Sequence, residues 1–257
     1  MSDALVRLDI HPLADDGWRQ RCREALNYSG ALVLRQFLQP QALAAIIEEG
    51  NAQRHLAYHT RSRHNVYLMK PDAAFSDAHP RNREVVSTKG CITDDVIAAS
   101  SPLRQLYNDA LFKRFLCDVL GEETLYPYAD PLSSINLHYA SDGQELGWHF
   151  DNSSFAITLL VQKPLAGGVF QYINDLRDAD AGGMNFSGVE AVLDARQPVN
   201  SLAIDAGDLV LFRGRNALHR VTPTEGEVTR MLAVLAYNTQ PGIALSETAR
   251  MTFYGRL

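Results

Sequence analysis

The chain has 257 residues, 46% of them hydrophobic and 21% charged, and a formal net charge of −6. This length can bury a substantial core, and the acidic balance without a basic cluster argues against a nucleic-acid-binding surface. No apolar run approaches membrane-spanning length. Three scattered cysteines are too few for a disulfide framework or a thiolate metal site, so we expect a cytoplasmic protein with reduced thiols.

Helical signals dominate the first half of the chain. Helices are predicted over residues 15–28, 40–55 and 102–120, with a short apolar strand over 31–34. Pro40 favours a first helical turn, where its missing N–H would be unpaired in any case. Ser101 is a suitable N-cap for the third helix and Gly121 a suitable end.

The stretch from residue 57 to residue 95 is polar and shows no sustained periodicity. We therefore expect it to be rich in loops. A loop region this long inside a compact domain is usually functional or else disordered.

After Gly121 the pattern changes to short apolar runs separated by turn signals. The predicted strands cover residues 134–140, 155–161, 167–173, 201–204, 208–212, 219–222 and 230–237. Many short strands after a helical front half predict an α+β fold with a double-stranded β-helix core, that is, a cupin-like jelly roll. We expect one domain over 1–257, with a mainly helical supporting part (1–125) and the jelly-roll core (126–257).

The motif Gly-Trp-His-Phe-Asp, residues 147–151, lies between two of these strands. On an extended backbone, side chains two apart share a face, so His149 and Asp151 project together. A histidine and a carboxylate side by side are two of the three ligands of a facial triad, which binds Fe(II) and leaves positions open. The motif alone is weak evidence, because the chain has 8 histidines and 30 acidic residues.

The third ligand is predicted to be His219, on a strand that a double-stranded β-helix places beside the first ligands. Arg230 follows eleven residues later and opens an otherwise apolar run. A buried arginine needs an anion, which a dicarboxylate cosubstrate would supply through the guanidinium fork. Alternatively, Arg230 pairs with a structural acid such as Asp205, and the two histidines are ordinary strand residues without a metal.

Together, His-x-Asp, Gly-Gly-x-Phe (167–170), Gly-Asp-Leu-Val-Leu-Phe (207–212), the distal histidine and the arginine resemble the Fe(II)/2-oxoglutarate-dependent oxygenases. More narrowly, residues 126–134, 146–151, 160–162, 218–223 and 79–82 resemble the BesD/HalD-like group, which modifies free amino acids. The resemblance implies Fe(II) held by His149, Asp151 and His219, with O2 and 2-oxoglutarate as cosubstrates. It also implies Arg230 as the ligand of the far carboxylate of 2-oxoglutarate, with Tyr139 or Asn136 as further contacts.

Asp151 distinguishes two reactions within this group. The halogenases have glycine at the carboxylate position, which leaves room for chloride, whereas this chain keeps the aspartate. The resemblance therefore implies hydroxylation of an unactivated C–H bond, with decarboxylation of 2-oxoglutarate to succinate.

A free amino acid carries two charges, and the pocket must pair both. Candidates for its carboxylate are Arg81 and Arg83, and candidates for its ammonium are Asp130 and Glu145. Asn152 and Trp148 are further candidates for the pocket. Each also has an ordinary interpretation: Arg81 and Arg83 as solvated loop charges, Asp130 as a turn former, and Trp148 as a core residue.

Other functions remain open at this point. The same iron chemistry would serve a peptide or carrier-tethered substrate, which an open groove would favour, or it would desaturate or cyclise its substrate. A metal-binding, cupin-like sensor without turnover is the alternative of another class. We expect no nucleic-acid or membrane partner, and the oligomeric state is left open, with a homodimer among the alternatives.

Overall fold

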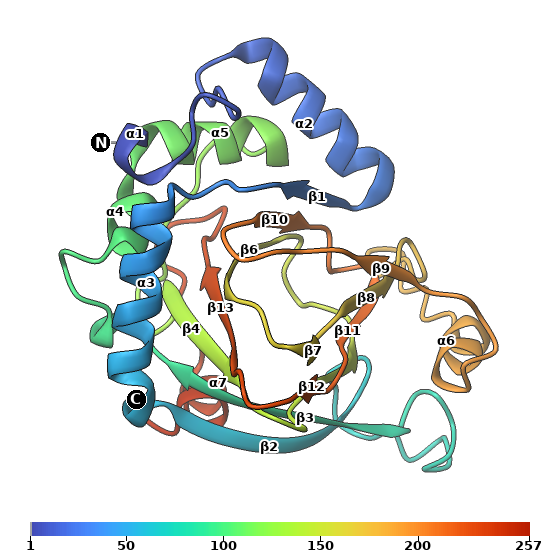
Figure 1. Ribbon diagram of the computed structural model, residues 1–257. Helices are drawn as coiled ribbons and strands as arrows, with labels where there is room; N and C mark the ends of the chain where they lie inside the picture. The colour runs from blue at the N-terminus through green and yellow to red at the C-terminus, as the bar shows by residue number, and fades with distance from the viewer. Residues whose placement is uncertain (1) are drawn as a thin grey trace.

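The structure is a computed structural model that describes residues 2–257. Its main feature is an 11-stranded, antiparallel sheet that curls around a central space (Figure 1). We call its larger half the major sheet, which consists of β1 (Ala31–Leu34), β10 (Leu209–Phe212), β6 (Ala156–Gln162), β13 (Arg230–Leu235), β4 (Ile135–Ala140), β3 (Glu84–Ile92) and β2 (Tyr58–Asn65). The minor sheet consists of β5 (Leu146–His149), β11 (Leu218–Val221), β8 (Phe170–Ile173) and β9 (Asn200–Leu202), and β3 joins it to the major sheet through the pairing of Ser87 with Leu146. The short strands β7 (Ala166–Gly167) and β12 (Thr224–Glu225) pair separately.

Helices pack on the outside of this curled sheet (Figure 1). On the side of the major sheet lie α1 (Ser2–Leu5), α2 (Asp16–Ser29), α3 (Pro40–Gln53), α4 (Pro102–Asn108) and α5 (Ala110–Leu120). The remaining helical segments are α6 (Phe186–Leu193) beside the minor sheet, α7 (Glu247–Tyr254) at the end of the chain, and the single turns η1 (Arg54–Leu56) and η2 (Asp94–Val96). The predicted α+β class is confirmed: α1 to α5 cover the major sheet of a curled antiparallel barrel, α6 lies beside the minor sheet, and α7 packs against the inner face.

The predicted helix over 102–120 is in fact two helices. Asp109 has an extended backbone, ends α4, and accepts a hydrogen bond from the backbone N–H of Phe112 at 2.9 Å as the N-cap of α5. Aspartate favours caps over helix interiors because its carboxylate binds free backbone N–H groups. The apolar periodicity continues through Asp109, so the sequence pattern does not reveal the break between the two helices.

The prediction of a loop-rich segment over 57–95 is wrong for its two ends, which form β2 and β3, whereas residues 66–83 between them contain no helix or strand. β2 and β3 form a continuous antiparallel ladder from Tyr58–Cys91 to Asn65–Glu84, and β3 also pairs with β4. β2 lies at the edge, with much of its length exposed, and the inner face of β3 is polar, so neither strand shows the apolar alternation that identifies strands. Helices α6 and α7 were likewise absent from the prediction.

Side-chain alternation gives the major sheet one apolar face and one face of mixed polarity. Ile135, Leu137 and Tyr139 of β4 and Met231 and Ala233 of β13 belong to the main core, which the helices cover. The residues between them point toward the space that the curled sheet encloses. We call this side of the sheet the inner face.

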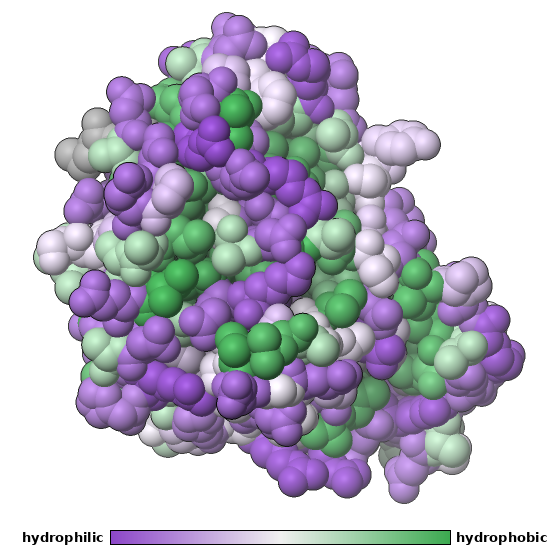
Figure 2. Space-filling view, in the orientation of Figure 1, coloured by the Kyte–Doolittle hydropathy of each residue, from purple (hydrophilic) through white to green (hydrophobic). Residues whose placement is uncertain are grey.

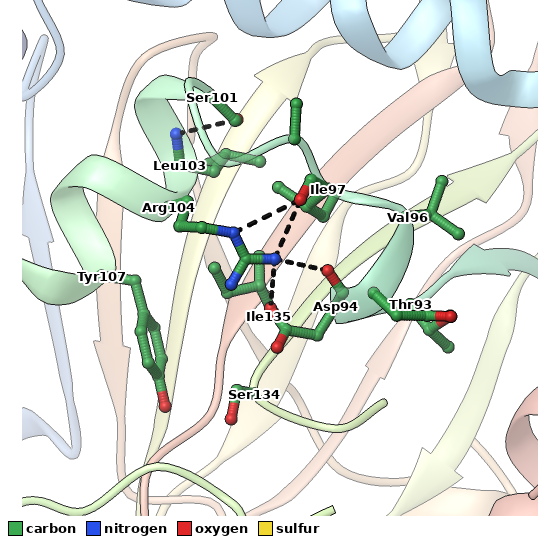
Figure 3. Close-up of polar contacts among 12 residues, drawn as sticks. Thr93, Asp94, Val96, Ile97, Ser101, Leu103, Arg104, Tyr107, Ser134 and Ile135 are labelled. Carbon is green, nitrogen blue, oxygen red and sulfur yellow. Dashed lines mark hydrogen bonds and ion pairs between the residues drawn. The ribbon is translucent and has the colours of Figure 1, made fainter. Parts of the chain in front are cut away.

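The connection from β3 to α4 is held by polar contacts (Figure 3). The Ser101 hydroxyl accepts a hydrogen bond from the Leu103 N–H at 3.2 Å, and the Arg104 guanidinium donates to the Ile97 carbonyl at 2.9 Å and pairs with Asp94 at 3.0 Å. These contacts fix the helical layer against the end of β3.

The surface is mostly hydrophilic, with separate apolar patches (Figure 2). Within residues 2–257, no helix is both long and apolar enough to cross a membrane.

Candidate metal centre and the inner face

Three side chains meet on the minor sheet. His149 on β5 and His219 on β11 are direct cross-strand partners, and Asp151 follows β5 by two residues. The Nε2 atoms of His149 and His219 lie 3.6 and 3.5 Å from Oδ1 of Asp151. The ligand atoms of all three residues lie within 4.8 Å of one another, which is a spacing that one metal ion can bridge.

Both imidazoles are oriented by the backbone. The Nδ1 atom of His149 donates to the Gly147 carbonyl at 2.8 Å, and that of His219 to the Ala217 carbonyl at 2.9 Å. Because a carbonyl only accepts, the proton lies on Nδ1 and the lone pair of each Nε2 is free to bind a metal. Burial, with the neighbouring His219 ring as a second cause, lowers the pKa of His149 to about 3, so this ligand is neutral at physiological pH.

The Asp151 carboxylate fits into a space that a glycine provides. A Cβ atom on Gly214 would lie only 1.8 Å from Oδ2 of Asp151, and the backbone N–H of Asp151 donates to the Gly214 carbonyl at 3.1 Å. Arg177 stacks over the Phe150 ring at 4.1 Å and donates to the Asp151 carbonyl at 3.3 Å. Burial works to raise the pKa of Asp151, but the two histidines and Arg177 outweigh it and the pKa lies below its ordinary value.

Arg230 lies on the inner face at the start of β13. It is 7% exposed, and among residues 2–257 it forms no ion pair, so the alternative pairing with Asp205 does not occur; Asp205 pairs with Lys163. Its side chain reaches toward Gly168, where a Cβ atom would lie 3.0 Å from Cδ of Arg230. Burial lowers the pKa of Arg230 to about 10, which leaves it charged at neutral pH. A buried cation without a counter-ion favours binding of an anion.

Four of the predicted contact residues lie apart from this centre. Tyr139 is fully buried on the helix-facing side of β4 and donates to the Gly50 carbonyl at 2.8 Å, a placement that does not favour contact with a cosubstrate. Trp148 lies on the outer face of the minor sheet, beneath Arg220. Asn152 is exposed. Asn136 is on the inner face, but its Oδ1 accepts a hydrogen bond from the Tyr254 hydroxyl at 2.9 Å.

The predicted charged residues of the substrate pocket also have structural partners. Asp130 accepts hydrogen bonds from Leu132, Ser133 and Leu245, as a turn former does. Arg83 pairs with Asp194 on α6. Arg81 is buried and donates to the Lys70 carbonyl at 3.0 Å, while its Nη1 has no hydrogen-bond partner.

Several inner-face residues were missed by the sequence prediction because β2 and β3 were not recognised as strands. His64 on β2 contacts the Ser87 hydroxyl at 2.7 Å, and its ring centroid is 6.3 Å from that of His149. Lys89 on β3 contacts His138 on β4. Ser87, Thr88 and Lys89 are three adjacent polar residues, so no alternation of polar and apolar side chains identified β3 as a strand.

Known proteins identify the family. A family model described as HalD, Halogenase D, matches residues 14–252. The chain belongs to the HalD family. This places it in the Fe(II)/2-oxoglutarate oxygenase superfamily, although its triad retains the aspartate. No curated protein matches the chain at a significant level.

Solved structures of this superfamily share the fold of this HalD-family protein. A 2OG-Fe(II) oxygenase family oxidoreductase from Burkholderia pseudomallei is 16% identical, with a TM-score of 0.56 over 89% of this chain and 94% of its own. The epimerase SnoN from nogalamycin biosynthesis, in complex with Fe3+, alpha ketoglutarate and nogalamycin RO, is 13% identical, with a TM-score of 0.59 over 87% and 84%. A prolyl-4-hydroxylase from Pseudomonas putida is 13% identical, with a TM-score of 0.52 over 84% and 97%. These similarities confirm the predicted double-stranded β-helix.

Proposed function

We propose that this HalD-family protein is an Fe(II)- and 2-oxoglutarate-dependent dioxygenase that hydroxylates an unactivated C–H bond of a free amino acid. The observation that supports it most is the convergence of His149, Asp151 and His219 with their ligand atoms within 4.8 Å, in a barrel that also contains the unpaired Arg230. Two imidazoles and one carboxylate on one face are the donor set that suits Fe(II).

The chain itself contributes binding, orientation and exclusion of water. The Gly147 and Ala217 carbonyls aim the two Nε2 atoms, Gly214 leaves room for the carboxylate of Asp151, and Arg230 receives the far carboxylate of 2-oxoglutarate. When bound, the iron and 2-oxoglutarate supply the oxidising power, with release of carbon dioxide and succinate.

Retention of Asp151 supports hydroxylation over halogenation. Its carboxylate takes the coordination position that glycine leaves open to chloride in the halogenases that the sequence resembles. The close packing of Asp151 against Gly214 also leaves little space for a halide beside it. The negative charge of Asp151 further opposes an anion at this position.

The position of helix α7 supports a small substrate over a peptide. Helix α7 packs against the inner face, where Tyr254 contacts Asn136 and forms a cluster with Cys91 and Leu132. A peptide or carrier-tethered substrate would need an open groove at this position. Three free cysteines are compatible with the cytoplasm, which we propose as the compartment.

The test is turnover with a panel of proteinogenic amino acids. Purified protein with Fe(II), 2-oxoglutarate and oxygen is expected to form succinate together with a product heavier by one oxygen atom, measured by mass spectrometry. Asp151→Gly is expected to abolish hydroxylation. If no amino acid stimulates succinate formation, the proposed substrate class is wrong, and if Asp151→Gly hydroxylates at the wild-type rate, Asp151 is not a ligand.

A further inference from the structure

The inner face carries a second cation beside Arg230. On β4, His138 is opposite Leu232 of β13, which shares the face of Arg230, and it is also opposite Cys91 of β3. Lys89 is two residues before Cys91 on the same strand and therefore lies on the same face. Lys89 and Arg230 thus lie on the two strands that flank β4, with His138 between them.

The amino group of Lys89 has one polar contact in the described chain. Its Nζ lies 3.4 Å from Nε2 of His138 and 6.0 Å from the ring centre of Phe253 on α7. Across residues 2–257, no carboxylate forms an ion pair with Lys89. Burial lowers the pKa of Lys89. Burial, together with the charges of Lys89 and Arg230, holds the pKa of His138 well below its ordinary value, so the imidazole is neutral and accepts a hydrogen bond from Lys89.

The ammonium group of Lys89 can donate more hydrogen bonds than the neighbouring side chain accepts. It has three N–H donors and one neutral acceptor, and the Phe253 ring of α7 lies 6.0 Å from it. A partly desolvated charge of this kind is costly unless an anion neutralises it. Under the proposed function, Arg230 takes the far carboxylate of 2-oxoglutarate, which leaves Lys89 for a different anionic group.

We propose that Lys89 is the specificity-determining residue that binds the carboxylate of the amino acid substrate, with His138 as the positioning residue that orients its amino group. This inference rests on the proposed function. Lys89 replaces Arg83 as the candidate for the substrate carboxylate, because Asp194 already neutralises Arg83. Arg81 is a competing candidate, because its Nη1 has no hydrogen-bond partner among the described residues.

The test compares amino acids with their carboxamides, which keep the side chain and the ammonium but lack the carboxylate charge. The protein is loaded with Mn(II), which does not turn over, and with 2-oxoglutarate. Binding of the 20 proteinogenic amino acids and their amides is then followed by the shift in melting temperature and by calorimetry. The variants are Lys89→Met, Lys89→Arg, His138→Gln and Arg81→Gln, of which the last tests the competing candidate.

We expect the wild type to bind at least one amino acid about tenfold or more tightly than its amide, because the amide cannot form the buried ion pair with Lys89. Lys89→Met is expected to remove this preference, Lys89→Arg to restore part of it, and His138→Gln to reduce it. The affinity for 2-oxoglutarate alone is expected to stay unchanged in Lys89→Met, which shows that the substituted protein is folded. Arg81→Gln is expected to keep the preference.

Three results would overturn the assignment of Lys89. They are a preference that survives in Lys89→Met, a preference that Arg81→Gln removes, and equal binding of each amino acid and its amide by the wild type. Failure of the wild type to bind Mn(II) and 2-oxoglutarate would refute the proposed function as well. An absence of binding by any amino acid would refute the proposed substrate class together with the role of Lys89, whereas equal binding of an amino acid and its amide would refute only the role of Lys89.

Discussion

Substituting Gly214 by alanine tests the metal centre through a residue that is not a ligand. Gly214 does not have the positive φ that strains other residues, so its backbone accepts alanine. The new Cβ would lie 1.8 Å from Oδ2 and 2.6 Å from Cγ of Asp151. To restore ordinary contact, the carboxylate has to move by about 1.5 Å. Metal–ligand distances tolerate only about 0.2 Å, so the bond from Asp151 is lost.

The expected loss of metal affinity is large compared with the loss of stability. Removing residues that merely orient metal ligands costs about 10–100-fold in affinity, so losing one of three protein ligands is expected to cost at least about 100-fold, or about 2.7 kcal/mol. Overpacking by one methyl group is expected to destabilise the metal-free protein by about 1–3 kcal/mol.

The assay is anaerobic titration with Fe(II) or Mn(II), together with urea unfolding of the metal-free protein. Gly17→Ala on α2 is the control, since its Cβ would meet atoms no closer than 3.4 Å. In an Asp151→Ala background, Gly214→Ala is expected to cost little stability, because the clashing carboxylate is absent. Wild-type metal affinity in Gly214→Ala would refute the geometry of the triad.

Other substitutions test separate parts of the inner face and the core. Arg230→Leu is expected to weaken binding of 2-oxoglutarate by about 2–5 kcal/mol, at least about 30-fold, because the far carboxylate loses its buried partner. An unchanged affinity for 2-oxoglutarate in anaerobic titration would show that Arg230 is not part of the cosubstrate site. Folding lowers the pKa of His138, so the neutral imidazole is favoured in the folded state. The free energy of unfolding is therefore highest above the unfolded pKa of about 6.5, and it decreases as the pH falls below that value. Between pH 7.5 and 5.5 the free energy of unfolding of the wild type should therefore drop by about 1.4 kcal/mol more than that of His138→Gln, as urea unfolding would measure, and equal drops would show that His138 titrates normally. Tyr139→Phe should lower stability by about 1 kcal/mol through the lost bond to Gly50, with cosubstrate affinity unchanged; weaker cosubstrate binding would instead return Tyr139 to the site.

The metal ligands could be predicted from the sequence because their positions follow from short sequence spacings and from the pairing of neighbouring strands. His149 and Asp151 are two residues apart on an extended backbone, and the jelly-roll pattern places His219 on the neighbouring strand. Apolar alternation likewise predicted β4, β6, β10 and β13, whose helix-facing residues form the main core.

The substrate side of the barrel was not predictable in the same way. β2 and β3 line a polar interior, so their inner faces lack apolar alternation and resemble a loop. Charged residues such as Arg83 were visible in the sequence, but only the fold shows that Asp194 on a distant helix neutralises it. Whether Lys89 has a partner depends equally on which strands are neighbours.

Alternation along β4 also separates two kinds of variation during protein engineering. Ile135, Leu137 and Tyr139 support the helical layer, whereas Asn136 and His138 face the enclosed space. A library restricted to His138 would alter ligand preference while leaving the scaffold intact, since Asn136 is itself tied to Tyr254 of α7. A library restricted to Ile135, Leu137 and Tyr139 would change thermal tolerance with little effect on which molecules are recognised. A single strand thereby offers two independent routes for directed evolution.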